Sequence, residues 1–254
     1  MELRQEQDQE IKPSLLVQRG KVKLSNRKLL NRILSVAEQG CKWRGLPCRF
    51  GNWPPIYRRM NRGAKTGVLN GRFEAWPAKK IVPVRIEAYS LDSKSVKVHA
   101  DGTGALKKNG KPSIGKSGGE WTTKIHLLAQ DAGRTRVFRL FPGHGHDMPE
   151  GESWLKGIDC PFPVGPMIMD PADEGDTTRP PALDLIFSPV VPAKSNRLDP
   201  WESDPEHDQK RNEVEGLFSR WQGFSRIFSG LDQLDRMFSA VWFLVLIVDS
   251  LRSC

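Results

Sequence analysis

Leu91-Asp92-Ser93-Lys94-Ser95-Val96-Lys97-Val98-His99 is a β-prone stretch that carries one acidic residue, Asp92. A second aspartate, Asp170, ends an apolar run that begins at Pro166, and Glu215 lies in a segment with helical spacing. Carboxylates of this kind can hold hard divalent metals, and two such ions can activate a water or a 3′ hydroxyl against a phosphodiester. Two aspartates beside strands and a glutamate on a helix therefore indicate a candidate metal site in an α/β fold.

The bulk composition is that of a globular protein with an anionic partner. The 254 residues are 38% hydrophobic and 27% charged, and the formal net charge is +9. This balance favours nucleic acid or an acidic membrane surface. The longest apolar run, residues 238–248, is too short to span a bilayer and predicts a buried C-terminal helix instead. Four scattered cysteines without a CxxC pair argue against a zinc knuckle, and the polar N-terminus predicts a cytoplasmic protein with reduced thiols.

Residues 1–80 are predicted to form a small helical domain. One helix begins at Ser25 or Asn26 and stops at Gly40, a second begins at Trp53 and ends at Gly63, and a third begins at Thr66. The region before residue 24 shows no clear period. The middle helix carries Arg58, Arg59 and Arg62. Three arginines on one short helix favour a DNA-binding, helix-turn-helix-like module over a helical bundle with a solvated basic surface.

Residues 81–254 are predicted to form a mixed sheet flanked by helices. Strands are expected at 81–98, 121–129, 136–141, 166–170 and 189–192, and residues 100–120, rich in Gly and Lys, are expected to form a flexible basic loop. A helix from about Pro205 carries Glu215 in a polar stripe with Asp208, Arg211 and Gln222. The stripe is either part of a functional cleft or the polar edge of an ordinary amphipathic helix.

Several segments together resemble the DDE transposases of bacterial insertion sequences, of the IS-five group. They are residues 40–47, 50–53, 57–59, 91–99, 114–119 with 122–126, 142–147 and 192–197. The resemblance covers residues 30–245. The combination of segments is specific to the family, whereas each segment alone would be weak support for it.

The resemblance implies an RNase H-like catalytic core in which Asp92, Asp170 and Glu215 bind two Mg²⁺ ions, with Mn²⁺ as a substitute. It implies a metal-dependent transposase that cuts the ends of its element and joins them to target DNA. Its partners are then double-stranded DNA and further copies of the chain, in the cytoplasm at the nucleoid. The residues expected to contact DNA are Arg58, Arg59, Arg62, Lys107, Lys108, Lys111, Lys116, Lys194, Arg197 and Arg211.

Two other functions stay open. Asp208 and Gln222 stand where the family has a tyrosine and a lysine, and Pro171 follows the second aspartate where the family has a cation. A catalytically impaired copy that only binds inverted repeats would fit these departures. A nuclease on the same core that does not transpose is the third reading. The lysines of the loop could equally be solvated, and Arg211 could pair with Asp208 or Glu215 on its own helix.

Overall fold

The structure is a computed structural model that describes residues 2–12, 24–67, 89–103, 112–130, 134–145, 154, 165–168, 187–190, 218–232 and 234–250. The chain divides into two compact units. A helical unit consists of Met1–Ile81, Val96–Pro112 and Trp221–Cys254, and a sheet unit consists of Val82–Ser95 and Ser113–Arg220. The fold class is mixed α/β, as predicted.

The helical unit begins with α1 (Gln5–Ile11), α2 (Asn26–Gln39) and α3 (Trp53–Lys65). The predicted start and stop of α2 are confirmed: the Ser25 hydroxyl accepts a hydrogen bond from the Lys28 N–H at 3.3 Å, and Gly40 ends the helix at φ +62°. A side-chain oxygen at the N-cap satisfies a backbone donor that the helix itself leaves without a partner. Short 3₁₀ turns, η2 (Trp43–Gly45) and η3 (Cys48–Phe50), connect α2 to α3.

One of these helices was not predicted, and the predicted end of another is wrong. The helix α1 was not expected, because its short polar sequence shows no apolar period beyond the buried Ile11. The helix α3 does not end at Gly63 but continues to Lys65, with Thr66 as its C-cap. Glycine costs only about 1 kcal/mol inside a helix, which packing of the buried Ile56 and Met60 can offset.

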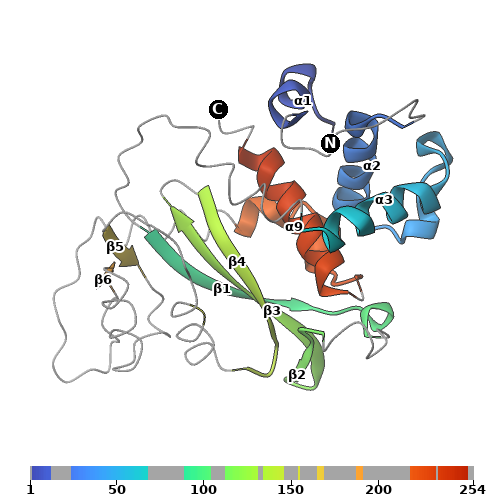
Figure 1. The fold of residues 1–254 in the computed structure, drawn as a ribbon. Coiled ribbons are helices and arrows are strands. Elements are labelled where there is room, and N and C mark those ends of the chain that lie inside the picture. The colour runs from blue at the N-terminus through green and yellow to red at the C-terminus, as the bar shows by residue number, and fades with distance from the viewer. Residues whose placement is uncertain are drawn as a thin grey trace, which may run out of the picture. The chain divides into compact units, whose positions relative to one another are not determined.

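The core of the helical unit includes the C-terminal helix α9 (Asp235–Ser250), which packs against α2 and α3 (Figure 1). Its side chains from Met237 to Val248 are buried apart from Ser239, so the predicted buried C-terminal helix is confirmed. Each such large apolar side chain contributes roughly 1.5–3 kcal/mol when fully buried. The short helix α8 (Ser225–Phe228) contacts α2 and α9. No helix within the described ranges is both long enough and apolar enough for a membrane span.

The sheet has six strands: β1 (Tyr89–Lys97), β2 (Gly115–Ser117), β3 (Glu120–Gln130), β4 (Arg134–Pro142), β5 (Gly165–Ile168) and β6 (Phe187–Val190). Their order is β2-β3-β1-β5-β6, and β4 also pairs with β3. The pairs β1–β5 and β5–β6 are parallel, whereas β2–β3 and β3–β4 are antiparallel. The predicted mixed sheet is confirmed, with its central strand β1 in the segment that carries Asp92.

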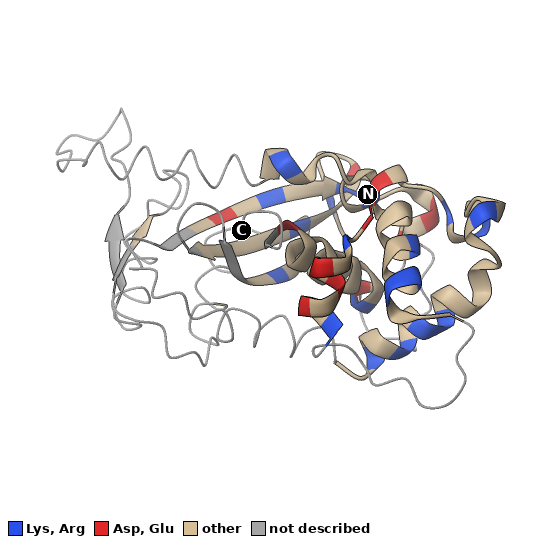
Figure 2. Ribbon diagram, turned by 90° about the horizontal axis from the view of Figure 1, so that it is seen from above, with Lys and Arg blue, Asp and Glu red and all other residues tan. Residues whose placement is uncertain are grey.

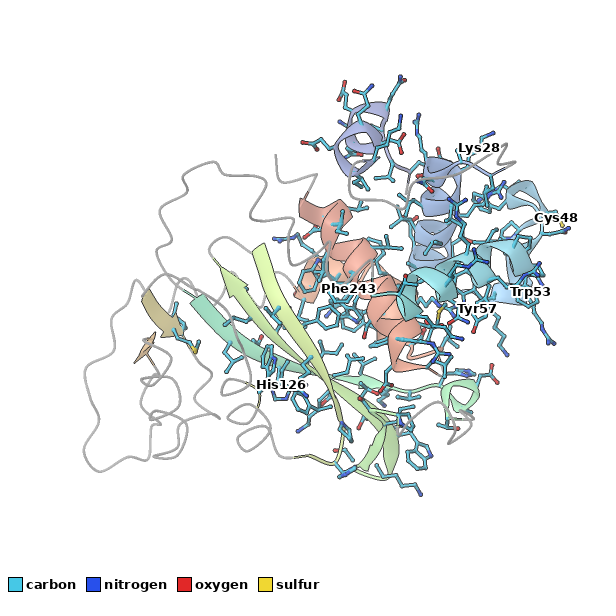
Figure 3. All side chains as sticks on the ribbon, viewed as in Figure 1. Lys28, Cys48, Trp53, Tyr57, His126 and Phe243 are labelled. Carbon is cyan, nitrogen blue, oxygen red and sulfur yellow. The ribbon has the colours of Figure 1, made fainter. Side chains whose placement is uncertain are left out.

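The core of the sheet unit lies around β3. Ile125 and Leu127 are fully buried, and His126 on the opposite face packs edge-on against Phe141 and Trp154 at centroid distances of 4.7 and 6.3 Å (Figure 3). All five predicted strands are present, and the predicted parts at 81–88, 169–170 and 191–192 lie outside the described residues. The predicted flexible loop at 100–120 is wrong in part, because residues 115–117 form β2 and pair with β3. Three residues are too short for an alternating pattern to reveal a strand.

Candidate active site and nucleic-acid interface

Asp92 lies on β1, the strand that has β3 on one side and β5 on the other. Its neighbour Leu91 is buried, while Asp92 itself is only half-buried. One Asp92 carboxylate oxygen accepts a hydrogen bond from the Ser93 N–H at 2.7 Å. An acidic side chain in the middle of a sheet, partly open to solvent, can bind a cation without the full desolvation cost of a buried charge.

The register between β1 and β5 determines which residues of the two strands lie side by side near Asp92. Tyr89 pairs with Met167, and Ser90 pairs with Ile168, in parallel orientation. Adjacent strands lie about 4.8 Å apart, and paired residues of a parallel ladder point to the same face. The described ladder ends two residues before Asp92.

The other two predicted metal ligands, Asp170 and Glu215, lie outside the described residues. So do Lys107, Lys108, Lys111, Lys194, Arg197 and Arg211 among the predicted DNA contacts. Within the described ranges, no three His, Cys, Asp or Glu side chains come together as a metal site. The predicted carboxylate trio therefore stays a prediction.

The three predicted arginines of α3 differ in their surroundings. Arg58 and Arg62, one helical turn apart, are exposed, and the Arg58 Nε donates to the Pro54 carbonyl oxygen at 3.4 Å. Arg59 is half-buried and connects α3 to the start of α2: its Nη1 donates to the Leu24 carbonyl oxygen at 2.7 Å, and its Nη2 donates to the Asn26 side chain. Burial, and to a lesser degree the nearby Arg62, lowers the pKa of Arg59. Arg58 and Arg62 are thus available to a ligand, whereas Arg59 holds two helices together.

The surrounding surface is strongly basic. Between residues 24 and 67 the sequence has ten Lys and Arg residues and a single acidic residue, Glu38. Figure 2, with Lys and Arg in blue, shows basic residues along the helices of this unit. A concentration of positive charge on one helical module is the electrostatic footprint of a nucleic-acid-binding surface.

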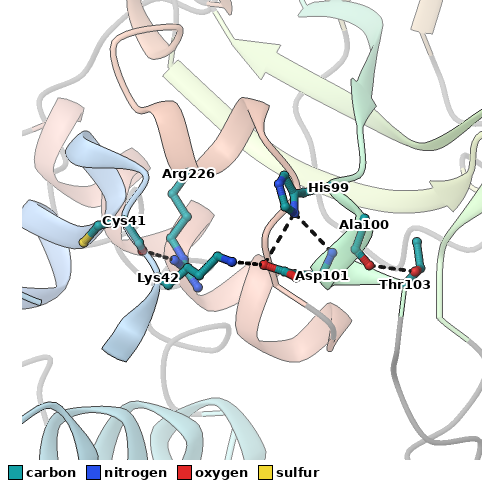
Figure 4. Close-up of polar contacts among 7 residues, drawn as sticks. All are labelled: Cys41, Lys42, His99, Ala100, Asp101, Thr103 and Arg226. Carbon is teal, nitrogen blue, oxygen red and sulfur yellow. Dashed lines mark hydrogen bonds and ion pairs between the residues drawn. The ribbon is translucent and has the colours of Figure 1, made fainter. Parts of the chain in front are cut away.

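The segment after α2 is held by a buried arginine that sequence reasoning did not single out. Arg226 on α8 is 2% exposed and makes two hydrogen bonds to Asp232, at 2.7 and 2.8 Å. Its Nη1 donates to the Cys41 carbonyl oxygen at 2.7 Å (Figure 4), and its guanidinium lies over the Trp43 ring, 5.0 Å from the centroid. Trp43 and Trp53 each also pack edge-on against Tyr57. Residues 40–43, part of the first segment that resembles the transposase family, therefore have a structural role.

A second polar contact in this unit joins Lys42 to Asp101 at 2.6 Å (Figure 4). The hydrogen bond from the Lys42 ammonium is the main reason that the pKa of the Asp101 carboxyl is lowered. Desolvation opposes it, and the charges of Lys42 and His99 lower the pKa further. The Asp101 N–H also donates to His99 Nδ1 at 3.1 Å. Both side chains of the Lys42–Asp101 pair are largely exposed, so the pair adds little stability.

Lys116, another predicted DNA contact, lies on β2 directly opposite Trp121 of β3. Its ammonium nitrogen lies 5.2 Å from the centroid of the Trp121 ring, within the range of a cation–π contact. Behind this hairpin, His144 and Thr122 pack so closely on Gly115 and Gly143 that a Cβ atom at either glycine would clash. Gly143 of the Pro142–Asp147 segment is thus explained by packing, and His146 and Asp147 lie outside the described residues.

Residues 3–73 match the family model described as "Putative transposase of IS4/5 family". The resemblance that the sequence motifs suggest is therefore confirmed by an independent comparison over this part of the chain. No curated protein sequence matches the chain.

Among solved structures, the synaptic complex of piggyBac transposase with hairpin DNA is similar, with a TM-score of 0.51 and 10% identity. The similarity covers 95% of this chain and 68% of that one. The paired-end complex of Mos1 transposase with its left transposon end matches at a TM-score of 0.29 and 9% identity. The match covers 82% of this chain and 80% of that one, and its TM-score is too low to support an argument about the fold. At this identity the piggyBac match shows a similar fold and nothing further.

Proposed function

We propose that this chain is a DNA transposase that cuts the ends of an insertion sequence and joins them to target DNA. The observation that carries the proposal is the parallel register of β1 and β5. Asp92 lies two residues beyond Ser90, and Asp170 lies two residues beyond Ile168, the last described pair of the ladder. A ladder that continued for two more residues would set Asp92 and Asp170 beside each other on one face of the sheet.

The donor set fits hard divalent cations. Asp92, Asp170 and Glu215 would offer only carboxylate oxygens, the ligands that Mg²⁺ and Mn²⁺ prefer. Divalent ions held there would supply an activated oxygen nucleophile and charge stabilisation for phosphodiester cleavage. The half-buried position of Asp92 on a central strand gives one donor a rigid support, which orients it better than a loop would.

The basic surface of the helical unit provides the DNA-binding half of the function. Arg58 and Arg62 are exposed on α3, in a segment with a large excess of positive charge. They would neutralise backbone phosphates and fix the position of the duplex, without reading its sequence. Binding two element ends at once would need a second copy of the chain.

The proposal is tested with the variant Asp92→Asn. The substrate is a duplex that carries the inverted repeat bordering this reading frame, with Mg²⁺ or Mn²⁺ and a target plasmid. Because an amide is a poor ligand for hard cations, we expect strand cleavage to fall by more than about 1,000-fold while the affinity for the same duplex is unchanged. Asp101→Asn, which replaces an exposed acid of the helical unit, is the matched control and should cleave like the wild type.

Cleavage that survives in Asp92→Asn would refute the assignment of the site. Two other outcomes distinguish the alternative functions. A wild-type chain that binds the repeat but never cuts it would be the impaired, DNA-binding copy, which the Asp208, Gln222 and Pro171 departures favour. A chain that cuts but yields no product joined to the target would be a nuclease.

A further inference from the structure

Trp121 is the one large apolar side chain among the described residues that is exposed, at 44% of its surface. It begins a row on one face of β3 that continues with Thr123, Ile125 and Leu127, all of which are buried. A buried row thus ends in an indole that faces solvent. A single exposed apolar residue is ordinary in proteins, so its setting decides whether it has a role.

The setting is a short hairpin at the end of the sheet where β2 pairs with the first residues of β3. β4 pairs with β3 only from Thr123 onward, and the first residues of β3 pair with β2 instead. The turn between them is Gly118–Gly119, with φ of +58° and +84°, the conformation of a tight two-residue hairpin. A Cβ atom at either glycine would meet no heavy atom within 4 Å, so both turn residues have open space around them.

The hairpin combines an aromatic ring with positive charge. Lys116 faces Trp121 across the strand pair, with its ammonium 5.2 Å from the ring centroid. The sequence that leads into the hairpin adds Lys107, Lys108 and Lys111. An aromatic face next to a cation is the arrangement by which proteins hold single-stranded nucleic acid: the ring stacks on a base, and the cation binds the adjacent phosphate.

We propose that the β2–β3 hairpin, through Trp121 and Lys116, binds an unpaired nucleotide of DNA. The inference rests on the proposed function, because cleaving and joining DNA ends leaves nucleotides without a complementary strand. Stacking on an indole is tolerant of sequence, which suits an end whose flanking bases vary. One indole with a flanking lysine is a smaller apolar surface than a stable protein interface needs.

The test measures binding of the full-length chain to two DNA probes, a blunt duplex and the same duplex with a short oligo-dT tail. We expect Trp121→Ala to weaken binding of the tailed probe by roughly 5- to 150-fold, the range for loss of one stacked base, and to leave the blunt duplex unaffected. Trp121→Phe should restore most of the affinity because it keeps an aromatic face. Ser117→Ala, in the same hairpin, is the matched control and should behave like the wild type.

Equal binding of both probes by Trp121→Ala and the wild type would overturn the inference, and so would failure of Trp121→Phe to restore affinity. Thermal unfolding of each variant shows whether the fold is retained. The two proposals fail separately. If Trp121→Ala binds the tailed probe like the wild type and the wild type cleaves DNA, only the role of the hairpin is refuted. If Trp121→Ala selectively weakens binding of the tailed probe but the wild type never cleaves, only the enzymatic function is refuted.

Discussion

Arg226 shows how one residue can organise a segment far away in the chain. Its guanidinium donates two hydrogen bonds to Asp232 and a third to the Cys41 carbonyl oxygen. It also lies over the Trp43 ring. Both charged side chains are almost fully buried, at 2% and 4% exposure. The desolvation of a buried ion pair of this kind costs much free energy. Replacing only one partner is therefore the most destabilising change, because it leaves the other charge buried without its counter-charge.

We expect Arg226→Met to lower the free energy of unfolding by about 3–5 kcal/mol, because it leaves the Asp232 carboxylate buried without its counter-charge. The double variant Arg226→Met with Asp232→Leu should be less destabilised than the single variant, since no charge is then left behind. Denaturant unfolding of the wild type, the single variant and the double variant compares their free energies of unfolding. A double variant that is less stable than the single one would show that the ion pair is not the source of the effect.

The element scale is illustrated by the end of α2. Gly40 has φ +62° and terminates the helix, and a Cβ atom there would lie 2.8 Å from the Ser225 Cβ of α8. Two requirements coincide at this position: a left-handed backbone and a close approach of α8. The sequence therefore predicts correctly that Gly40 ends the helix. That Gly40 also allows the close approach of α8 is visible only in the packed structure.

We expect Gly40→Ala to destabilise the helical unit by roughly 1–3 kcal/mol through backbone strain, with a further loss from the contact with Ser225. Gly45→Ala is the control, since Gly45 has no positive φ and open space around its Cβ position, and its effect should stay within about 0.5 kcal/mol. Thermal unfolding compares the two variants. Equal stability of both would mean that neither the backbone conformation nor the α8 contact matters.

At the scale of the whole molecule, charge is the dominant property. The formal net charge of +9 is concentrated in sequence, with ten basic residues and one acidic residue between positions 24 and 67. Binding of such a surface to DNA is driven by the release of counterions and must weaken as salt rises.

The variant with Arg58→Gln and Arg62→Gln should bind duplex DNA more weakly at all sequences. The slope of log affinity against log salt should become shallower by about 1.8, which corresponds to two lost phosphate contacts. The charge-conserving variant with Arg58→Lys and Arg62→Lys should keep the wild-type slope. Fluorescence anisotropy titrations over a range of salt concentrations measure it. An unchanged slope in the glutamine variant would exclude this face of α3 from the DNA contact.

The local features of this protein are determined by its sequence. The cap at Ser25, the stop at Gly40, the apolar C-terminal helix and the five longer strands follow from periodicity and turn residues, because these depend on neighbours a few positions away. The end of α3 and the strand β2 were wrongly predicted, because a helical glycine and a three-residue strand depend on packing. The tertiary structure alone decided that Arg226 meets Cys41, that β1 pairs in parallel with β5 in the register Ser90–Ile168, and that Trp121 stays exposed. Such pairings join residues distant in the chain, and no local pattern specifies which distant partner a segment meets.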